Sequence, residues 1–163
     1  MLRVLAGGLL CVGAAAGGVL IRRHYNDKAA LAGEIAAFIS ALKNKIKFLK
    51  TPLLDATSEF IAQNEGKKSR FCDILKSFKE AKASGKPFQP DTGLLSAEDK
   101  TELENFFASI GKSNVEITVE NLKYFESYFL NSFEKRKEEA KRLGGMYFKL
   151  MTLLGIALMI IVA

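Results

Sequence analysis

The sequence contains few of the residues from which most enzyme active sites are built. It has one histidine, His24, and two cysteines, Cys11 and Cys72. The Cys and His residues do not have the spacing of a zinc site, no glycine-rich loop follows a strand, and no serine lies in a nucleophile elbow. We therefore predict a protein that is not an enzyme, with no catalytic residue, metal site, cofactor or small-molecule substrate.

The positive charge also lacks the pattern of a nucleic-acid-binding protein. The net charge is +6, but no run of Lys and Arg with interleaved aromatic residues forms a compact patch. Much of this charge lies beside long apolar segments, where attraction to anionic lipid headgroups explains it better. We predict contact with a lipid bilayer and no nucleic-acid partner.

Long uncharged runs occupy both ends of the chain. Residues 4–21 form a run of 18 without a charge, and residues 146–163 form a second run of 18 interrupted only by Lys149. At about 1.5 Å of rise per residue, each run spans about 27 Å as a helix, close to the roughly 30 Å hydrocarbon core of a bilayer. Both lengths predict transmembrane helices.

The basic residues predict the orientation of these two spans. Of the 24 Lys and Arg residues, only Arg3 lies outside residues 22–149. Basic residues that flank a span stay on the cytoplasmic side. We expect an N-terminal transmembrane helix over residues 1–22, a cytoplasmic helical bundle over 23–143, and a C-terminal transmembrane helix over 144–163.

Other interpretations of the two ends remain open. Residues 14–16 are all alanine and offer a signal-peptide cleavage site, although a single arginine precedes the apolar run. A lipid anchor on Cys11 is disfavoured because small residues do not directly precede it. The C-terminal run could instead be a buried core helix. However, residues 150–163 have no polar face, which is typical of a helix in lipid or deep inside a large protein, and this protein is small.

The middle of the chain predicts an all-α fold, an antiparallel bundle of about five to six helices. Apolar residues recur at steps of three and four, and Pro52 ends the first amphipathic helix, which Asn26 and Asp27 are expected to cap. Ser69, Ser96 and Ser113 are candidate N-caps. The apolar stripes, which predict the core, contain Leu31, Ile35, Phe38, Ile39, Leu42, Ile46 and Leu49, then Phe71, Ile74, Leu75 and Phe78, then Leu103, Phe106, Phe107 and Ile110, and finally Leu122, Phe125, Phe129 and Phe133.

Four local patterns are spread over nearly the whole chain: a glycine-rich N-terminal span that ends in Arg22-Arg23 with Tyr25 beyond it, Thr51-Pro52-Leu53, Ile110-Gly111-Lys112-Ser113-Asn114, and a charged helix that runs into Lys141-Arg142-Leu143-Gly144. Together they resemble the stage III sporulation protein AB family. Ile110, Asn114 and Thr118 depart from the family's Leu, Asp and Gln at the turn after the fourth predicted helix. Any family-specific role of that turn is therefore in doubt, although its capping function is kept.

The resemblance implies a scaffold in a sporulation channel complex between mother cell and forespore. Its cytoplasmic domain would be similar to that of type II secretion platform proteins. It would bind a secretion-type ATPase and neighbouring membrane subunits of the complex, from the mother-cell side of the forespore membrane. An alternative is a membrane-anchored helical adaptor or regulator unrelated to secretion.

Two turns are the candidate partner-binding site. The predicted helix lengths place both turns at the membrane-distal end of the bundle. Both turns also contain helix-capping residues, so a purely structural role is the alternative. The candidate residues are Thr51, Pro52 and Leu53 in one turn and Gly111, Lys112, Ser113 and Asn114 in the other.

Overall fold

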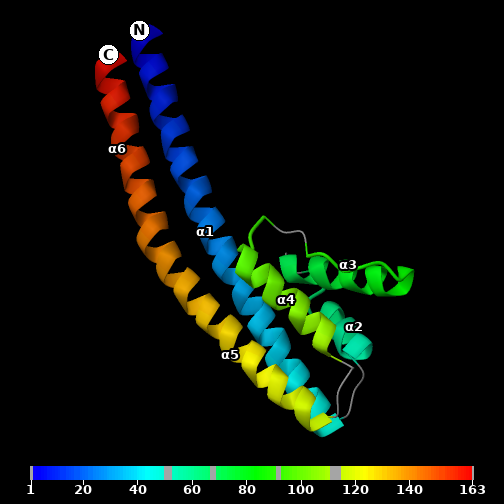
Figure 1. Ribbon diagram of the computed structural model, residues 1–163. Helices are drawn as coiled ribbons and strands as arrows, with labels where there is room; N and C mark the ends of the chain where they lie inside the picture. The colour runs from blue at the N-terminus through cyan, green and yellow to red at the C-terminus, as the bar shows by residue number, and fades with distance from the viewer. Residues whose placement is uncertain (1, 50–52, 67–68, 91–92, 111–114, 163) are drawn as a thin grey trace. The chain divides into compact units, whose positions relative to one another are not determined.

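Helices account for nearly all of the described chain. A computed structural model describes residues 2–49, 53–66, 69–90, 93–110 and 115–162. In chain order these residues form α1 (Leu2–Leu49), α2 (Leu53–Gln63), α3 (Arg70–Ser84), α4 (Ala97–Ser109), α5 (Val115–Glu139), the π-helix η1 (Ala140–Gly144) and α6 (Gly145–Val162) (Figure 1). These ranges contain no strand, so the predicted all-α fold class is confirmed.

Helix boundaries follow the capping residues that the sequence predicts. The Ser69 hydroxyl accepts a hydrogen bond from the Cys72 N–H at the start of α3, and Gly85 ends this helix in the left-handed conformation at φ 66°. The Ser96 hydroxyl accepts from the Asp99 N–H at the start of α4. Each serine satisfies a backbone donor that has no partner within its helix.

The predicted helix start at Asn26 and Asp27 is wrong. Residues 2–49 form one continuous helix, and both residues lie inside it. An N-cap residue must leave the helical conformation. Here no proline or glycine interrupts residues 19–32, and the alanines at 29, 30 and 32 favour helix. The backbone N–H groups of residues 26 and 27 can therefore donate hydrogen bonds to carbonyl oxygens of the preceding turn.

The chain divides into two compact units. The terminal unit consists of Met1–Ala29 and Glu134–Ala163, and the central unit is Ala30–Phe133. Helices α1 and α5 contribute to both units, whereas α2, α3 and α4 belong wholly to the central one.

All five helices of the central unit contribute to one hydrophobic core. The predicted stripes are confirmed for Leu31, Ile35, Phe38, Ile39, Leu42 and Ile46 of α1, Phe71, Ile74, Leu75 and Phe78 of α3, Leu103, Phe106 and Phe107 of α4 with Ile110 just beyond it, and Leu122, Phe125 and Phe129 of α5. Phe106 and Phe129 are 0% exposed. Phe38 is in edge or tilted contact with three other rings, those of Phe60, Phe71 and Phe106. Phenylalanine contacts between helices therefore make up much of this core.

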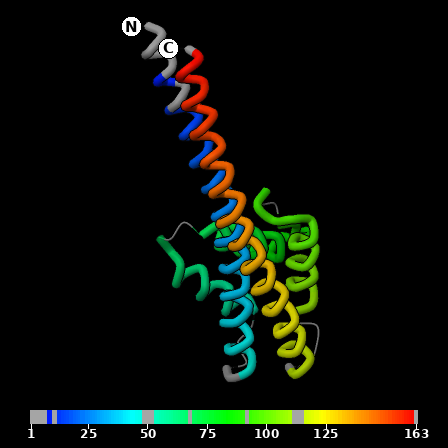
Figure 2. The backbone as a smooth tube through the Cα atoms, turned by 90° about the vertical axis from the view of Figure 1, so that its left-hand side faces the viewer, coloured from blue at the N-terminus to red at the C-terminus, as the bar shows by residue number. Residues whose placement is uncertain are grey.

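Helices α1 and α5 run in opposite directions within the central unit. Gly33 lies against Phe133, and ten residues later along α1 the Lys43 ammonium pairs with the Glu126 carboxylate. Residue numbers thus rise along α1 as they fall along α5. The backbone trace shows the end of α1 beside the start of α5 (Figure 2). The antiparallel order of the whole predicted bundle stays a prediction.

In the terminal unit α6 lies beside the N-terminal half of α1 (Figures 1 and 2). A Cβ atom placed on Gly18 would be 3.2 Å from Met151 Cβ and 3.3 Å from Phe148 Cα. The side chains of Tyr25 and Tyr147 stack, with ring centroids 6.4 Å apart and planes 9° apart. A small residue allows the two backbones to approach closely, which is typical of helix pairs in lipid.

Candidate functional site

The predicted partner-binding residues lie mostly outside the described ranges. Thr51, Pro52 and the turn from Gly111 to Asn114 are not described. Leu53 is the first residue of α2, and its half-buried side chain packs against the core. The helices that flank the two turns meet at one end of the central unit, since the end of α1 lies beside the start of α5 in both views (Figures 1 and 2). The docking role of these residues stays a prediction.

The apolar C-terminal helix is the clearest functional feature of the described chain. Within the described residues, one helical run, Glu116–Ile161, is long and apolar enough to cross a membrane. Its apolar side chains in α6 face outward: Leu153 is 63% exposed and Ile160 is 71% exposed. Such exposure is unfavourable in water and is typical of a surface that contacts lipid. The other predicted span, the N-terminal one over residues 1–22, stays a prediction.

The glycines of α1 do not all serve the pairing with α6. Gly18 provides the close contact, whereas added Cβ atoms on Gly13 and Gly17 would meet no atom within 4 Å. The Gly13–Gly17 spacing predicts a helix-pairing face. Within the terminal unit that face is open, and the neighbouring position, Gly18, lies in the contact.

A π-helix marks the junction between α5 and α6. Ala140 and Gly144, its first and last residues, are both buried, whereas Lys141 and Arg142 between them are exposed. A π-turn holds more residues than an α-turn, and such turns frequently occur at functional sites. The backbone stays helical at Gly144 and Gly145.

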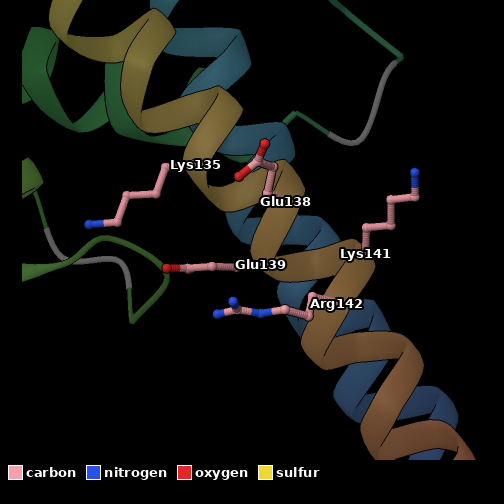
Figure 3. A pocket seen from close by; sticks show the side chains of 5 residues that line it. All are labelled: Lys135, Glu138, Glu139, Lys141 and Arg142. Carbon is pink, nitrogen blue, oxygen red and sulfur yellow. The ribbon is translucent and has the colours of Figure 1, made fainter.

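Charged side chains line a surface hollow around this π-helix. They are Lys135, Glu138, Glu139, Lys141 and Arg142. Figure 3 shows Lys135, Glu139 and Arg142 extending on one side of the helix, with Lys141 extending on the other. The two acidic residues lie between Lys135 and the pair formed by Lys141 and Arg142, so this pair lies nearer to α6 than the acids do.

Polar contacts also connect helices within the central unit. The Glu34 carboxylate on α1 accepts a hydrogen bond from the Ser69 hydroxyl (2.8 Å) and another from the Phe71 N–H (3.2 Å), so it caps α3 from a different helix. Its negative charge at the N-terminus of α3 is also favourable to the helix dipole. The sequence predicts only that Glu34 borders or caps the apolar stripe.

Asp99 is 3% exposed and connects α4 with α5. Its Oδ1 accepts hydrogen bonds from the Tyr128 hydroxyl (3.3 Å) and the Ser132 hydroxyl (3.1 Å). Burial, the charge of Asp99 and this hydrogen bond, with smaller contributions from Glu98 and Glu102, raise the pKa of Tyr128 to about 12. No local sequence signal predicts this contact, because Asp99 lies 29 and 33 residues from its two partners.

The ion pair between Lys43 and Glu126 is a further polar contact. Burial raises the pKa of Glu126, but hydrogen bonds from Lys43 and Ser40 and the charge of Lys43 outweigh it, so its pKa lies below the usual value. The pair is partly shielded, with side chains 22% and 17% exposed. The ion pair therefore connects α1 with α5 within the central unit.

The two residues with the most reactive side chains belong to different units. His24 is exposed and contacts the ring of Tyr25 edge-on, while Cys72 is a buried free thiol in α3. In the described part of the chain, no group of three or more His, Cys, Asp and Glu residues is placed to hold a metal ion.

These features define a class: all-helical proteins with a phenylalanine-rich core and an apolar helix able to enter a membrane. The chain belongs to the stage III sporulation protein AB family, whose model matches residues 3–163. It is therefore a sporulation-related protein. No significant match to a curated protein or to a solved structure was found.

Proposed function

We propose that this protein is a non-enzymatic platform subunit of a secretion-like channel complex, inserted in the forespore membrane on the mother-cell side. Its two spans hold the central unit in the cytoplasm, where it binds a secretion-type ATPase and neighbouring membrane subunits. The membership of the chain in a sporulation family supports the biological setting. The family match over residues 3–163 supports the choice of partners.

The observation that carries this proposal is the single helical run from residue 116 to residue 161. Its first part contributes Leu122, Phe125 and Phe129 to the core, and its last part, α6, exposes apolar side chains. One helix therefore connects a packed soluble body to a segment suited to lipid. A scaffold that holds a cytoplasmic machine at a membrane requires such a connection.

The ATPase would bind at the turns that contain Pro52 and Lys112. The test is co-purification of the full-length protein in detergent with the tagged ATPase of the same organism. Pro52→Ala combined with Lys112→Glu should reduce the bound ATPase at least about tenfold, which corresponds to about 1.4 kcal/mol of binding free energy. The melting temperature of the variant should stay nearly unchanged.

The matched control changes the same residue types in another turn. Lys86→Glu combined with Pro87→Ala alters two exposed residues between α3 and α4 and should leave the bound ATPase at the wild-type level. Equal binding by both variants would mean that the two predicted turns are helix caps only. If the wild-type protein itself bound no ATPase, the adaptor function unrelated to secretion would replace the platform.

A further inference from the structure

The junction between α1, η1 and α6 in the terminal unit is strongly basic and borders two apolar segments. Residues 22–28 and 141–149 together hold six Lys and Arg residues and one acid, Asp27. Four of the basic residues, which we call the basic collar, are exposed: Arg22, Arg23, Lys141 and Arg142. On the apolar side of this collar, Leu20 is 63% exposed and Leu150 is 52% exposed. Exposed charge and exposed apolar surface thus meet at one level of the helix pair.

Arg22 packs against Gly144. A Cβ atom on Gly144 would lie 3.4 Å from Arg22 Cγ and 3.5 Å from Arg22 Cα, which are ordinary van der Waals distances, so the two residues are in direct contact. The stem lies against η1 while the residue as a whole remains exposed. Long basic side chains at membrane surfaces adopt this arrangement, with the apolar stem buried and the charged tip in the headgroup layer.

The π-helix places two more basic side chains beside this contact. Ala140 and Gly144 are buried, so the wide turn directs Lys141 and Arg142 outward. Figure 3 shows them leaving the helix on opposite sides. Among the described residues, no carboxylate lies within ion-pair distance of Arg22, Lys141 or Arg142.

The acidic neighbours limit where an anion can bind. Glu138 and Glu139 also line the hollow, but they lie about one turn farther from α6 than the two bases. An anion that moved along the helix away from the apolar segment would meet their negative charges. An anion at the level of Arg22 and Gly144 would meet basic side chains on both sides of η1.

Aromatic residues mark the same level. The stacked Tyr25 and Tyr147 come from α1 and α6, and Lys28 Nζ lies 5.9 Å from the centroid of the Tyr25 ring. Tyrosine is enriched where a helix passes from the hydrocarbon core into the headgroup layer. Two tyrosines from two helices therefore indicate the depth at which lipid phosphates lie.

We propose that Arg22, Lys141 and Arg142 bind the headgroup phosphates of anionic phospholipids on both sides of η1, and that the Arg22–Gly144 contact positions the arginine. The site rests on the membrane-anchored part of the proposed function. It adds a lipid selectivity that insertion alone does not require, because an apolar helix enters zwitterionic and anionic bilayers alike.

The test uses an introduced tryptophan as a fluorescent reporter. Because the sequence contains no other tryptophan, all indole fluorescence comes from this one residue. Tyr147→Trp in the full-length protein places the indole at the level of the collar. The protein is reconstituted into vesicles of phosphatidylcholine and phosphatidylglycerol, in which one lipid or the other carries bromine on its acyl chains. Bromine quenches the indole fluorescence on contact, so the ratio of quenching reports which lipid occupies the site.

We expect phosphatidylglycerol to be preferred severalfold. Each of Arg22→Gln, Lys141→Gln and Arg142→Gln should lower that preference up to about fivefold. The double variant Arg22→Gln/Arg142→Gln should bring the two lipids close to equal occupancy. Its control, Lys76→Gln/Lys86→Gln, removes the same charge from two exposed lysines of the central unit and should keep the preference.

The outcomes separate this site from the proposed function. Equal quenching by both lipids in an inserted protein would overturn the site and leave the platform standing. An equal loss in the control variant would show that net charge alone acts, with no site. Loss of the preference in excess inorganic phosphate would assign the site to free phosphate instead. Failure to float with either vesicle type would overturn both the membrane anchor and the site.

Discussion

The ring of Phe133 on α5 lies against Gly33 on α1: its Cδ2 and Cε2 atoms would be 3.1 Å from a Cβ atom placed on Gly33. Glycine inside a helix costs roughly 0.5–1 kcal/mol relative to alanine. Its presence in the middle of α1 therefore has a packing reason. Without a side chain at 33, the Phe133 ring can approach the α1 backbone.

We predict that Gly33→Ala and Phe133→Leu are coupled. In the wild type, the gain in helix propensity from Gly33→Ala is offset because the Phe133 ring must shift. In the Phe133→Leu background the same change should be more favourable by at least about 0.5 kcal/mol. Chemical unfolding of the four proteins in the double-mutant cycle measures this difference. Simple additivity of the two changes would contradict the packing explanation.

Glu34→Ala should destabilise the central unit by about 1–2 kcal/mol, because it removes an acceptor for Ser69 and for the Phe71 N–H at the start of α3. Ser69→Ala should have a similar effect, and the double variant should cost less than the sum. Chemical unfolding measures these differences. Glu65→Ala, at an exposed position after α2, is the control and should change stability by less than about 0.5 kcal/mol.

The Tyr128–Asp99 contact predicts a pH dependence of stability at high pH. The folded-state pKa of Tyr128 is about 12, above the value near 10 of an unfolded tyrosine. A raised folded-state pKa means that the contribution is fully present below about pH 10 and is lost as the pH rises through about 12.

Tyr128→Phe should therefore be less stable than wild type at neutral pH, by about 1 kcal/mol for the lost hydrogen bond. The difference should shrink between about pH 10 and pH 12. Chemical unfolding at several pH values measures it. Tyr124→Phe, at a neighbouring residue that is 56% exposed, should show no such convergence. A constant gap for Tyr128→Phe would mean that the phenol does not titrate differently on folding.

A fragment of residues 27–142 should be soluble, strongly helical and cooperatively folded, because the core lies within the central unit. Phe106→Ala or Phe129→Ala should cost it about 3–5 kcal/mol, since both side chains are fully buried. Circular dichroism during thermal unfolding tests both statements. A non-cooperative transition in the wild-type fragment would show that this core needs the terminal helices.

Reporter fusions test the two-span topology. A fusion after Ala163 should behave as extracytoplasmic and one at Gln89 as cytoplasmic, because the basic residues beside each span stay inside. Gln89 is exposed between α3 and α4, so a fusion there should not disturb the core. Opposite activities would reverse the orientation, and two cytoplasmic signals would leave one span at most.

Local sequence patterns determined the helical elements and the side of each helix that is buried. Steps of three and four place Leu122, Phe125 and Phe129 on one face of α5, and burying apolar area is the main favourable term in folding. Ser69, Gly85 and Ser96 mark helix ends through hydrogen bonds or conformations within their own turns. Such short-range physics can be read without knowing where any other helix lies.

Tertiary structure decided the features that depend on a neighbour distant in sequence. The contacts of Glu34 with Ser69 and of Asp99 with Tyr128 join residues 35 and 29 positions apart. The fit of Arg22 over Gly144 likewise requires the pairing of α1 with η1. Their energies come from geometry between helices, and no local pattern in a single segment specifies that geometry.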